Sequence, residues 1–309
     1  MRFFSVHTHC TYSFGDGYGT PEVHAARLAE LGYTGAAITD HGNVSAHPPW
    51  EKALIKHGLH PVFGCELYTA PRDEKSKWHQ TVVAETLEGY RSLNRLVSAS
   101  WKTLGTTSKT KWPTCHSDML AEHCAGIIST SGCADSLLAC TLLGGKSLGA
   151  QRDRAGPDDV DRAKRVISWF KSVYPESYYL EVQRFPELQR TRTLNSIYAE
   201  LSAELHVPIV ATADVHYLHP DQNKIQVALH AALRGGTVDS QEAGWEYSIP
   251  LCYPISDKEI GKQLMATGLT RKQAWAAILN SEEIGQRCQV TLPKSERVRY
   301  PGTTADLTW

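Results

Sequence analysis

Nitrogen and oxygen donors stand directly after the first apolar run of this sequence. In VHTHCTYSFGDG, His7, His9 and Asp16 follow a run that stops at Val6. Because the side chains of a strand alternate between its two faces, both imidazoles of the His-x-His pair lie on one face. Such a pair serves either as part of a metal site or as buried histidines satisfied by hydrogen bonds. The rest of the sequence must decide between these uses.

The same residue types recur after four further apolar runs. His41 stands in TDHGN, Glu66 in FGCE, Cys133 in TSGC, and Asp214 with His216 in TADVHY. A single Asp-His or Asp-x-His motif is commonly a cap or a core histidine, but here donors repeat at one position relative to each run. This repetition favours a shared metal site.

Short β-rich runs alternate with helical patterns along most of the chain. The expected strands are 3–6, 34–39, 61–68, 80–84, 125–129, 178–183 and 207–212. One expected helix begins at Pro21 and stops at Gly32. The other expected helices cover 49–57, 86–100, 117–122, 157–173, 187–205, 221–233, 256–266 and 271–286. Strands separated mostly by helices indicate parallel βα units, in a barrel or a doubly wound sheet. In both folds the carboxyl ends of the strands share one face, where donors that follow different strands meet.

His79 is the exception, because it precedes its expected strand at 80–84. We expect it to reach the shared face from a loop. With it, the candidates are five histidines, three carboxylates and one cysteine, which exceeds the ligand number of one ion. At three or four protein ligands per ion, the set suits two or three divalent ions, and its mixed donors favour Zn, Mn or Fe over Mg or Ca.

Composition and charge indicate an ordinary soluble protein. The 309 residues are 41% hydrophobic and 21% charged, with a formal net charge of −1. Nucleic-acid binding would therefore depend on local basic patches. We find no apolar run long enough for a membrane span and no secretory signal. The eight cysteines are scattered, which favours reduced thiols and a cytoplasmic location.

The alternation of strands and helices stops near residue 235. Beyond it, two helical patterns and the short run QVTLP remain. We therefore expect a barrel domain over residues 1–235 and a small, mainly helical extension over 236–309 that packs on the barrel.

The motifs resemble, in order, those of the PHP (polymerase and histidinol phosphatase) family. The matching segments are VHTHCTYSFGDG, AAITDHGN, PVFGCELY, the His79 segment, IISTSGC and VATADVHYL. They are most similar to the PHP domain at the N-terminus of bacterial DNA polymerase III α subunits. The likeness runs from residue 3 to about 235 and continues more weakly to about 292.

The resemblance implies a distorted (β/α)7 barrel with up to three metal ions on the rim formed by the carboxyl ends of the strands. It also implies how the nine donors divide. His7, His9, Glu66 and Asp214 would hold one ion, Glu66 would bridge to a second ion held by His79 and Cys133, and Asp16, His41 and His216 would hold the third.

The resemblance further implies a 3′–5′ exonuclease that acts on DNA. A cluster of ions hydrolyses phosphoesters because one ion activates water while its neighbours neutralise the phosphate oxygens. We therefore expect single-stranded 3′ ends as substrate and a DNA polymerase as a candidate partner, in replication or repair. The polymerase relatives continue for several hundred more residues, whereas this chain stops at Trp309. We expect a free-standing PHP enzyme or a fragment, not a polymerase.

Several residues outside the donor set are candidates for supporting roles. Asp40 is our candidate for a carboxylate that orients a ligand, and a helix cap or turn is its other use. Glu181 and Gln183 end strand 178–183 and suit either a site contact or plain packing. For substrate the candidate segment is 101–115, and a solvated loop anchored by its tryptophans is the more common use of such a segment. Its candidate contacts are Lys102, Lys109, Lys111 and Trp112.

Two other functions stay open. One is a phosphatase acting on a small phosphate monoester, as in the other branch of the family. The residues of the TDHGN and ADVHYL motifs, which are similar to those of the polymerase branch, argue against it. So does Asp16, because the phosphatase branch more often carries histidine at this position. The other is a non-catalytic docking module for a polymerase, stabilised by metal. The complete donor set argues against this second alternative.

Overall fold

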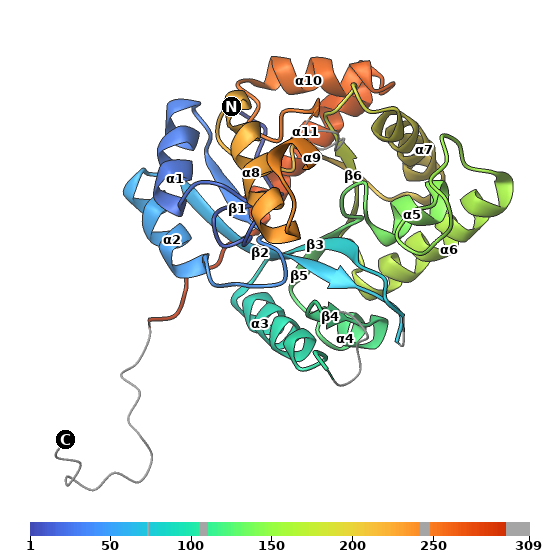
Figure 1. Ribbon diagram of the computed structural model, residues 1–309, viewed down its shortest axis with the longest axis horizontal. Helices are drawn as coiled ribbons and strands as arrows, with labels where there is room; N and C mark the ends of the chain where they lie inside the picture. Colours follow the sequence, from blue (N-terminus) through green and yellow to red (C-terminus); the bar gives the residue numbers. More distant parts are fainter. Residues whose placement is uncertain (73, 106–110, 242–247, 295–309) are drawn as a thin grey trace, which may run out of the picture.

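The computed structural model describes residues 1–72, 74–105, 111–241 and 248–294 (Figure 1). Its strands are β1 (Gly35–Ile38), β2 (His60–Thr69), β3 (Trp78–Ala84), β4 (Thr114–Cys115), β5 (Ile127–Thr130), β6 (Tyr178–Gln183) and β7 (Ile209–Thr212). Its helices are α1 (Pro21–Glu30), α2 (His47–Lys56), α3 (Leu87–Trp101), α4 (Ser117–Glu122), α5 (Leu137–Leu143), α6 (Pro157–Val173), α7 (Gln189–Leu205), α8 (Asn223–Arg234), α9 (Val238–Gln241), α10 (Asp257–Ala266) and α11 (Arg271–Arg287). A short 3-10 turn, Pro220–Gln222, precedes α8.

The strands form a sheet that the N-terminal segment closes into a distorted barrel. The strand order is β1-β2-β3-β5-β6-β7, and β4 pairs with β2 off this path. Ser5 bridges to Ala36 in β1, and Thr8 bridges to Val215 just after β7. Residues 5–8 therefore lie between the two ends of the sheet and complete a circuit of seven chain segments. The predicted distorted barrel is confirmed.

Two details of the predicted sheet are wrong. The expected first strand, 3–6, forms only isolated bridges, because Ser5 pairs with one neighbour and Thr8 with the other instead of building a ladder. The sheet is also not wholly parallel, since β3 runs antiparallel to both β2 and β5. No helix lies between β2 and β3 among the described residues, and a short connection suits an antiparallel pair.

The inside of the barrel changes from apolar to polar along the strands. At the end of the barrel where the parallel strands begin, one buried apolar cluster contains Phe4, Val6, Ala37, Val62, Ile128, Tyr179 and Val210, with Val83 near the end of the antiparallel β3 and Ile284 and Cys288 from the α11 end. Two and four residues further along β2 and β6, on the same face, stand Gly64 and Glu66, and Glu181 and Gln183; Thr212 is two residues further along β7, and Asp214 follows just after that strand. Because side chains on one face of a strand recur every two residues, these polar side chains form a rim next to the buried apolar cluster.

The outer helices shield the strands, and the largest apolar cluster lies between the two layers. Local sequence signals start several helices. Thr86, Ser136 and Ser256 each accept a hydrogen bond from a backbone N–H in the first turn of the helix that follows. At α11, Thr270 and Gln273 form a reciprocal capping box. These caps agree with the helix starts expected near 86, 256 and 271.

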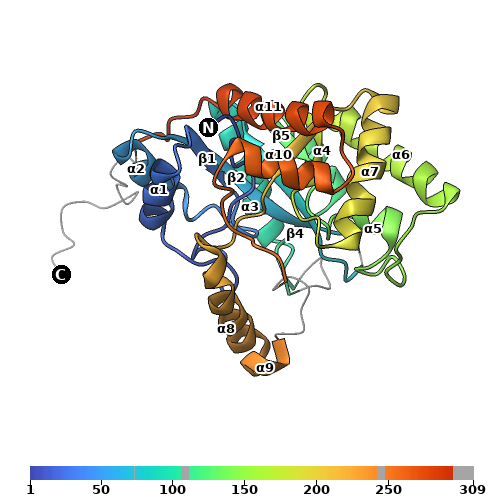
Figure 2. The ribbon, with the colours of Figure 1, turned by 90° about the horizontal axis from the view of Figure 1, so that it is seen from above.

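The C-terminal helices close the end of the barrel opposite the polar rim. α11 packs along β7 and reaches β1, and α10 packs on α11 (Figure 2). The carboxylate of Asp257 accepts hydrogen bonds from the backbone of Arg2 and Phe3. A side chain at Gly285 would lie 2.5 Å from the ring of Phe4, so glycine allows the close approach of α11. The division of the chain at residue 235 stays a prediction.

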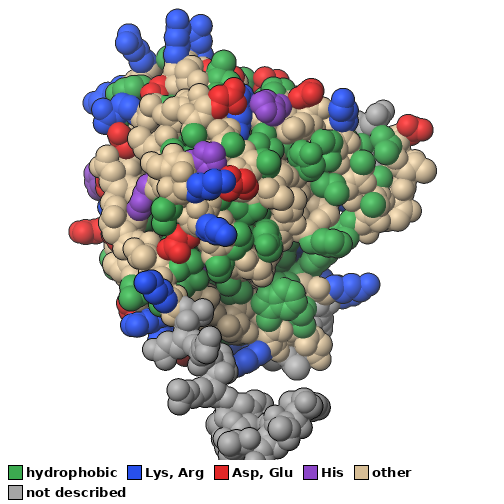
Figure 3. All heavy atoms as spheres, turned by 90° about the vertical axis from the view of Figure 1, so that its left-hand side faces the viewer, with side chains coloured by type: hydrophobic (Ala, Val, Ile, Leu, Met, Phe, Trp, Pro, Cys, Tyr) green, Lys and Arg blue, Asp and Glu red, His purple; other side chains and the backbone are tan. Residues whose placement is uncertain are grey.

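The outer surface shows no dominant charge on the face formed by α1 and α2. Basic and acidic side chains alternate over it (Figure 3). This pattern agrees with the small net charge and leaves electrostatic binding to local patches. None of the helices among the described residues combines the length and apolar character needed to cross a bilayer.

Candidate metal centre

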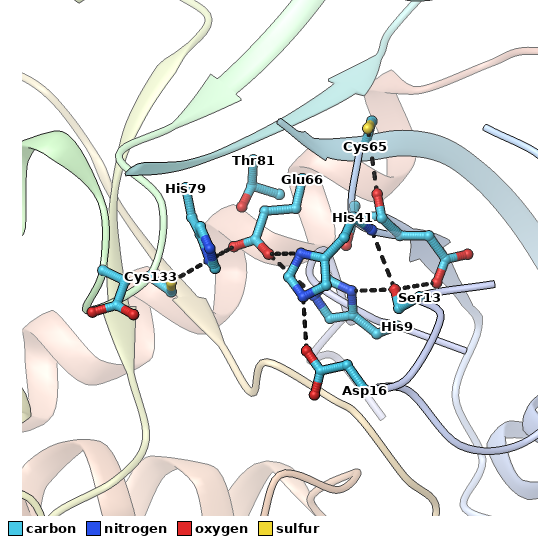
Figure 4. Close-up of polar contacts among 12 residues, drawn as sticks. His9, Ser13, Asp16, His41, Cys65, Glu66, His79, Thr81 and Cys133 are labelled. Atoms are coloured by element: carbon cyan, nitrogen blue, oxygen red, sulfur yellow. Dashed lines mark hydrogen bonds and ion pairs between the residues drawn. The ribbon is translucent and has the colours of Figure 1, made fainter. Parts of the chain in front are cut away.

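All nine predicted donors meet at the polar rim of the barrel. Six of them are labelled in Figure 4, where Glu66 lies at the centre, His79 and Cys133 on one side, and His9, His41 and Asp16 on the other. They come from segments that are far apart in the sequence: the loop after residue 6, the ends of β1, β2, β5 and β7, and β3.

His79 reaches this rim from within a strand, not from a loop. It is the second residue of β3 and pairs with Tyr68 near the carboxyl end of β2. Because β3 is antiparallel to its neighbours, its first residues lie beside the last residues of β2. The expectation of a loop position was wrong because strand direction was assumed to be uniform.

His7 and His9 turn their Nε2 atoms toward each other and toward two carboxylates. The two Nε2 atoms are 3.1 Å apart. Nε2 of His7 lies 3.3 Å from both Glu66 Oε1 and Asp214 Oδ1. Asp214 adopts a left-handed φ of 45°, which is uncommon for a residue other than glycine and typical of functional sites. These four side chains are the set expected for the first ion.

Glu66 also contacts two further histidines. Its Oε2 lies 2.8 Å from Nδ1 of His41, and its Oε1 lies 3.2 Å from Nδ1 of His79. Sγ of Cys133 is 3.4 Å from the same His79 nitrogen. A carboxylate that touches donors on both sides has the position of a bridging ligand, as expected for the second group.

Asp16 gathers the third group and links it to α8. Its Oδ2 lies 2.9 Å from Nε2 of His41 and 3.4 Å from Nε2 of His216. Its Oδ1 accepts hydrogen bonds from Nε2 of Gln226, at 2.8 Å, and from Nε2 of His230, at 2.7 Å. The sequence analysis missed both α8 residues, although their i, i+4 spacing places them on one helix face.

The donor atoms are better placed to bind cations than to form hydrogen bonds with one another. Nδ1 of His7 donates to Glu181 and Nδ1 of His9 donates to Ser13, so the neutral form of each ring presents a lone pair at its facing Nε2. Among the described residues, four buried atoms of the cluster have no hydrogen-bond partner: His41 Nδ1, Glu66 Oε1, His79 Nε2 and Asp214 Oδ1. His41 Nδ1 and Glu66 Oε2 are close, yet they are not aligned for a hydrogen bond. Buried acceptors crowded together without protons between them are stabilised by positive ions.

Three overlapping triplets of donor atoms are compact enough to hold a metal. They are His7, His9 and Glu66; His41, Glu66 and His79; and His9, His41 and His216. Within each triplet all donor atoms lie within 4.8 Å of one another. This grouping suits more than one divalent ion.

The electrostatics of the cluster show an excess of negative charge around His7. Burial lowers the pKa of His7, but the carboxylates of Asp214, Glu181 and Glu66 raise it well above its usual value. Burial and the nearby imidazoles of His216 and His41 hold the pKa of His9 well below its usual value. His9 therefore stays neutral, whereas the carboxylates around His7 favour a positive charge at that position.

The two carboxylates at the centre of the cluster stay ionised. Burial raises the pKa of Glu66, but His79, His7 and His41 lower it well below its usual value. For Asp16, burial acts in the same direction and is outweighed by His216, His230 and His41. Both side chains thus have the charged form that binds divalent ions.

Two side chains that are not themselves among the nine donors orient His7 and His9. Glu181 accepts from Nδ1 of His7 at 2.9 Å and is held by the hydroxyls of Thr130 and Thr212. Ser13 accepts from Nδ1 of His9 and donates to Asp40 at 2.6 Å. Asp40 thus reaches His9 through Ser13. Such bonds fix the ring tautomer and direct Nε2 at a metal.

A cavity of about 380 Å³ opens beside the cluster. Of the predicted substrate contacts, Trp112 lines it, whereas Lys102 and Lys111 are exposed and do not, and Lys109 lies outside the described residues. The cations that line it are Lys77, Lys146 and Arg234. Sequence reasoning missed them because no local pattern marks a lysine that faces a site formed by distant segments.

Comparisons with known proteins give one family model and several relatives of similar sequence. A family model described as the PHP domain matches residues 5–185. The DNA polymerase III subunit alpha of Helicobacter pylori J99 is 26% identical over 97% of this chain and 24% of its own length. That of Treponema pallidum is 27% identical over 95% of this chain and 24% of its own length. The chain thus spans about a quarter of these relatives.

Among solved structures, a two-domain protein from Bacteroides vulgatus contains a predicted PHP-like metal-dependent phosphoesterase. It is 11% identical to this chain, and the match covers 70% of this chain and 52% of that one, with a TM-score of 0.40. At this TM-score we draw no conclusion from the likeness.

Proposed function

This chain belongs to the PHP domain family, and on that premise we propose that it is a metal-dependent phosphodiesterase that removes nucleotides from the 3′ end of DNA. The observation that carries the proposal is the rim cluster itself. Nine donors from distant segments converge there, and four of their buried atoms have no hydrogen-bond partner among the described residues. A cluster that only stabilised the fold would not need an adjoining cavity, whereas here a cavity lined by cations lies beside the donors.

The side chains of the cluster have separate tasks in this proposal. His7, His9, Glu66 and Asp214 would hold one divalent ion, Zn, Mn or Fe, and the groups around His79 and Asp16 would hold one or two more. Bound ions would activate water and neutralise the charge of the phosphate oxygens. Glu181 and Ser13 each hold a ring proton on Nδ1, of His7 and of His9, so that Nε2 is the atom of each ring that would face an ion.

DNA is the proposed substrate for two reasons. The relatives from Helicobacter and Treponema are named DNA polymerase III subunit alpha, and the motif resemblance is to the polymerase branch of the family. The cavity, about 380 Å³, is within the range of small-ligand pockets and suits a terminal nucleotide. A DNA polymerase is the proposed partner.

The test uses the metal-loaded full chain and single-stranded DNA labelled at either the 3′ or the 5′ end. Stepwise shortening of the 5′-labelled strand from its 3′ end is expected with Mn²⁺ or Zn²⁺. His9→Ala should abolish it, while His123→Ala, which alters the histidine directly after α4, should not. Intact DNA together with hydrolysis of p-nitrophenyl phosphate would favour the monoester phosphatase. Metal-bound protein that cleaves neither would favour a docking module.

A further inference from the structure

A lysine in the cavity wall is held between two aromatic rings. Nζ of Lys77 lies 4.4 Å from the ring centroid of Tyr68 and 4.0 Å from that of Trp112. The rings themselves meet at an angle of 57°. Cation–π attraction therefore fixes the ammonium group in one place although the lysine stem is flexible.

No carboxylate forms an ion pair with Lys77 in the described parts of the chain. The neighbouring cation, Lys146, differs, because its Nζ pairs with Asp135 at 2.9 Å. Both lysines line the cavity. A fixed ammonium that faces a cavity without a protein anion is available for an anion of the substrate.

Lys77 stands one ring away from the metal cluster. The Tyr68 ring that it covers lies 5.6 Å from the rings of both His41 and His79, and it stacks on His41 with an interplanar angle of 20°. The phenol ring is thus next to both the ammonium and two of the histidines that would hold the ions. Lys77 itself contacts the rings of Tyr68 and Trp112, and among the residues that the structure describes it has no direct contact with a donor of the cluster.

Hydrogen bonds connect the segment that carries Lys77 to the loop around Lys146. Nε1 of Trp78 donates to the carbonyl of Lys146 at 3.1 Å, and the hydroxyls of Ser76 and Ser147 lie 2.5 Å apart. These contacts join residues 76–78 to the loop around Lys146. The two lysines therefore belong to one surface, with Lys77 toward the aromatic side.

We propose that Lys77 binds the phosphate next to the scissile one, so that the site selects a polynucleotide strand over a compound with one phosphate. This inference rests on the proposed function and names the substrate feature that the site recognises. Trp112 and Tyr68 are positioning residues that hold the ammonium group. The geometry needs no base-specific contact, so the selection is for the sugar-phosphate backbone.

The test compares substrates with one and with several phosphates. Lys77→Met is expected to raise KM for a single-stranded oligonucleotide about tenfold to a hundredfold, the size of one hydrogen bond to a charged group. Its kcat/KM for bis-p-nitrophenyl phosphate should be unchanged. Lys77→Arg should restore most of the oligonucleotide activity, and Lys75→Met, an exposed lysine on the same segment, serves as the matched control.

Binding provides a second readout that does not depend on cleavage. With a phosphorothioate single strand, the slope of log K against log salt should fall by about 0.7 in Lys77→Met and stay unchanged in Lys75→Met. Wild-type cleavage of DNA with an unchanged slope and KM in Lys77→Met would overturn the inference and leave the exonuclease intact. Equal loss on both substrates would also overturn it, because Lys77 would then act on the scissile phosphate.

A third outcome would contradict the exonuclease proposal while the inference about Lys77 holds. If the wild-type chain binds the strand but cleaves no DNA with any metal, the exonuclease proposal fails. The smaller salt slope of Lys77→Met would then still support backbone binding by Lys77. Absence of strand binding by the wild type would overturn the inference together with the DNA substrate.

Discussion

Glu181 holds the imidazole of His7 from behind the metal centre, with Oε1 2.9 Å from Nδ1. Both side chains are fully buried, and Glu181 is itself fixed by the hydroxyls of Thr130 and Thr212. Nε2 of His7 consequently points at Glu66 and Asp214. A residue at the end of β6 that binds no ion in our proposal thus determines the direction of the first ligand.

Replacing this carboxylate should weaken metal binding without unfolding the protein. Glu181→Gln keeps the size of the side chain and its capacity for hydrogen bonds, but it removes the charge that favours a proton on Nδ1. We expect metal affinity to fall about tenfold to a hundredfold. Competition with a chelator measures this, and Glu122→Gln on α4 is the matched control. Equal affinities in wild type and Glu181→Gln would contradict the orienting role.

The contact between α8 and Asp16 should matter for one group of donors only. Gln226→Leu removes the hydrogen bond to Oδ1 of Asp16 and leaves His7, His9 and Glu66 in place. The expected result is about a tenfold weaker affinity for the ion proposed for Asp16, His41 and His216, with the others retained. Metal analysis during stepwise dialysis would show it. Simultaneous loss of all ions would instead indicate that the cluster binds as one unit.

The loop that carries Asp16 requires glycine at position 17. A Cβ there would lie 2.2 Å from the carbonyl oxygen of Cys10, so Gly17→Ala must displace the turn. We expect a loss of about 1–3 kcal/mol in the free energy of unfolding, together with weaker metal binding. Urea denaturation and metal titration measure the two effects.

Gly261→Ala is the matched control for that substitution. It lies within α10, and the nearest atom to its added Cβ would be Ile278 Cδ1 at 3.8 Å. Because alanine favours a helix over glycine, this variant should be more stable by up to about 1 kcal/mol. Equal stabilities of the two variants would show that the turn at Gly17 tolerates a side chain.

Two buried histidines away from the donors make stability fall in acid. Burial lowers the pKa of His24 and of His47 to about 4, although a backbone hydrogen bond opposes the shift in each. In the unfolded chain a histidine has a pKa near 6.5. Protonation therefore favours unfolding, and the stability present above about pH 6.5 is lost as the pH falls toward 4.

The measurement is urea unfolding of metal-free protein between pH 7.5 and 4.5. Each of these histidines contributes a slope of up to about 1.4 kcal/mol per pH unit within that window. His47→Gln keeps a donor for the carbonyl of Gly64 and should flatten the curve by that amount. Parallel curves for wild type and variant would mean that His47 is accessible to protons in the folded state.

Local sequence was sufficient to predict the donors and much of the framework. Eight of the nine candidate side chains could be selected because strands end at apolar-to-polar transitions and carboxyl ends collect binding residues, and His79 was the exception. The helix starts at Ser256 and Thr270 follow from capping residues adjacent in the chain. Each of these features depends on residues within a few positions of one another, so a single sequence contains the signal.

Tertiary structure alone decided the remaining features, because each depends on a partner distant in the chain. The direction of β3, and with it the place of His79, is set by pairing with β2 and β5. The alternation of apolar and polar residues along a strand is the same whichever way the strand runs, so the sequence does not reveal this direction. Asp40 reaches His9 only through Ser13, while Glu181, 174 positions away, contacts His7 directly. Lys77 faces the cavity because Tyr68 and Trp112, brought together by the barrel, enclose its ammonium group. Packing between distant segments creates these relationships, and no local pattern contains them.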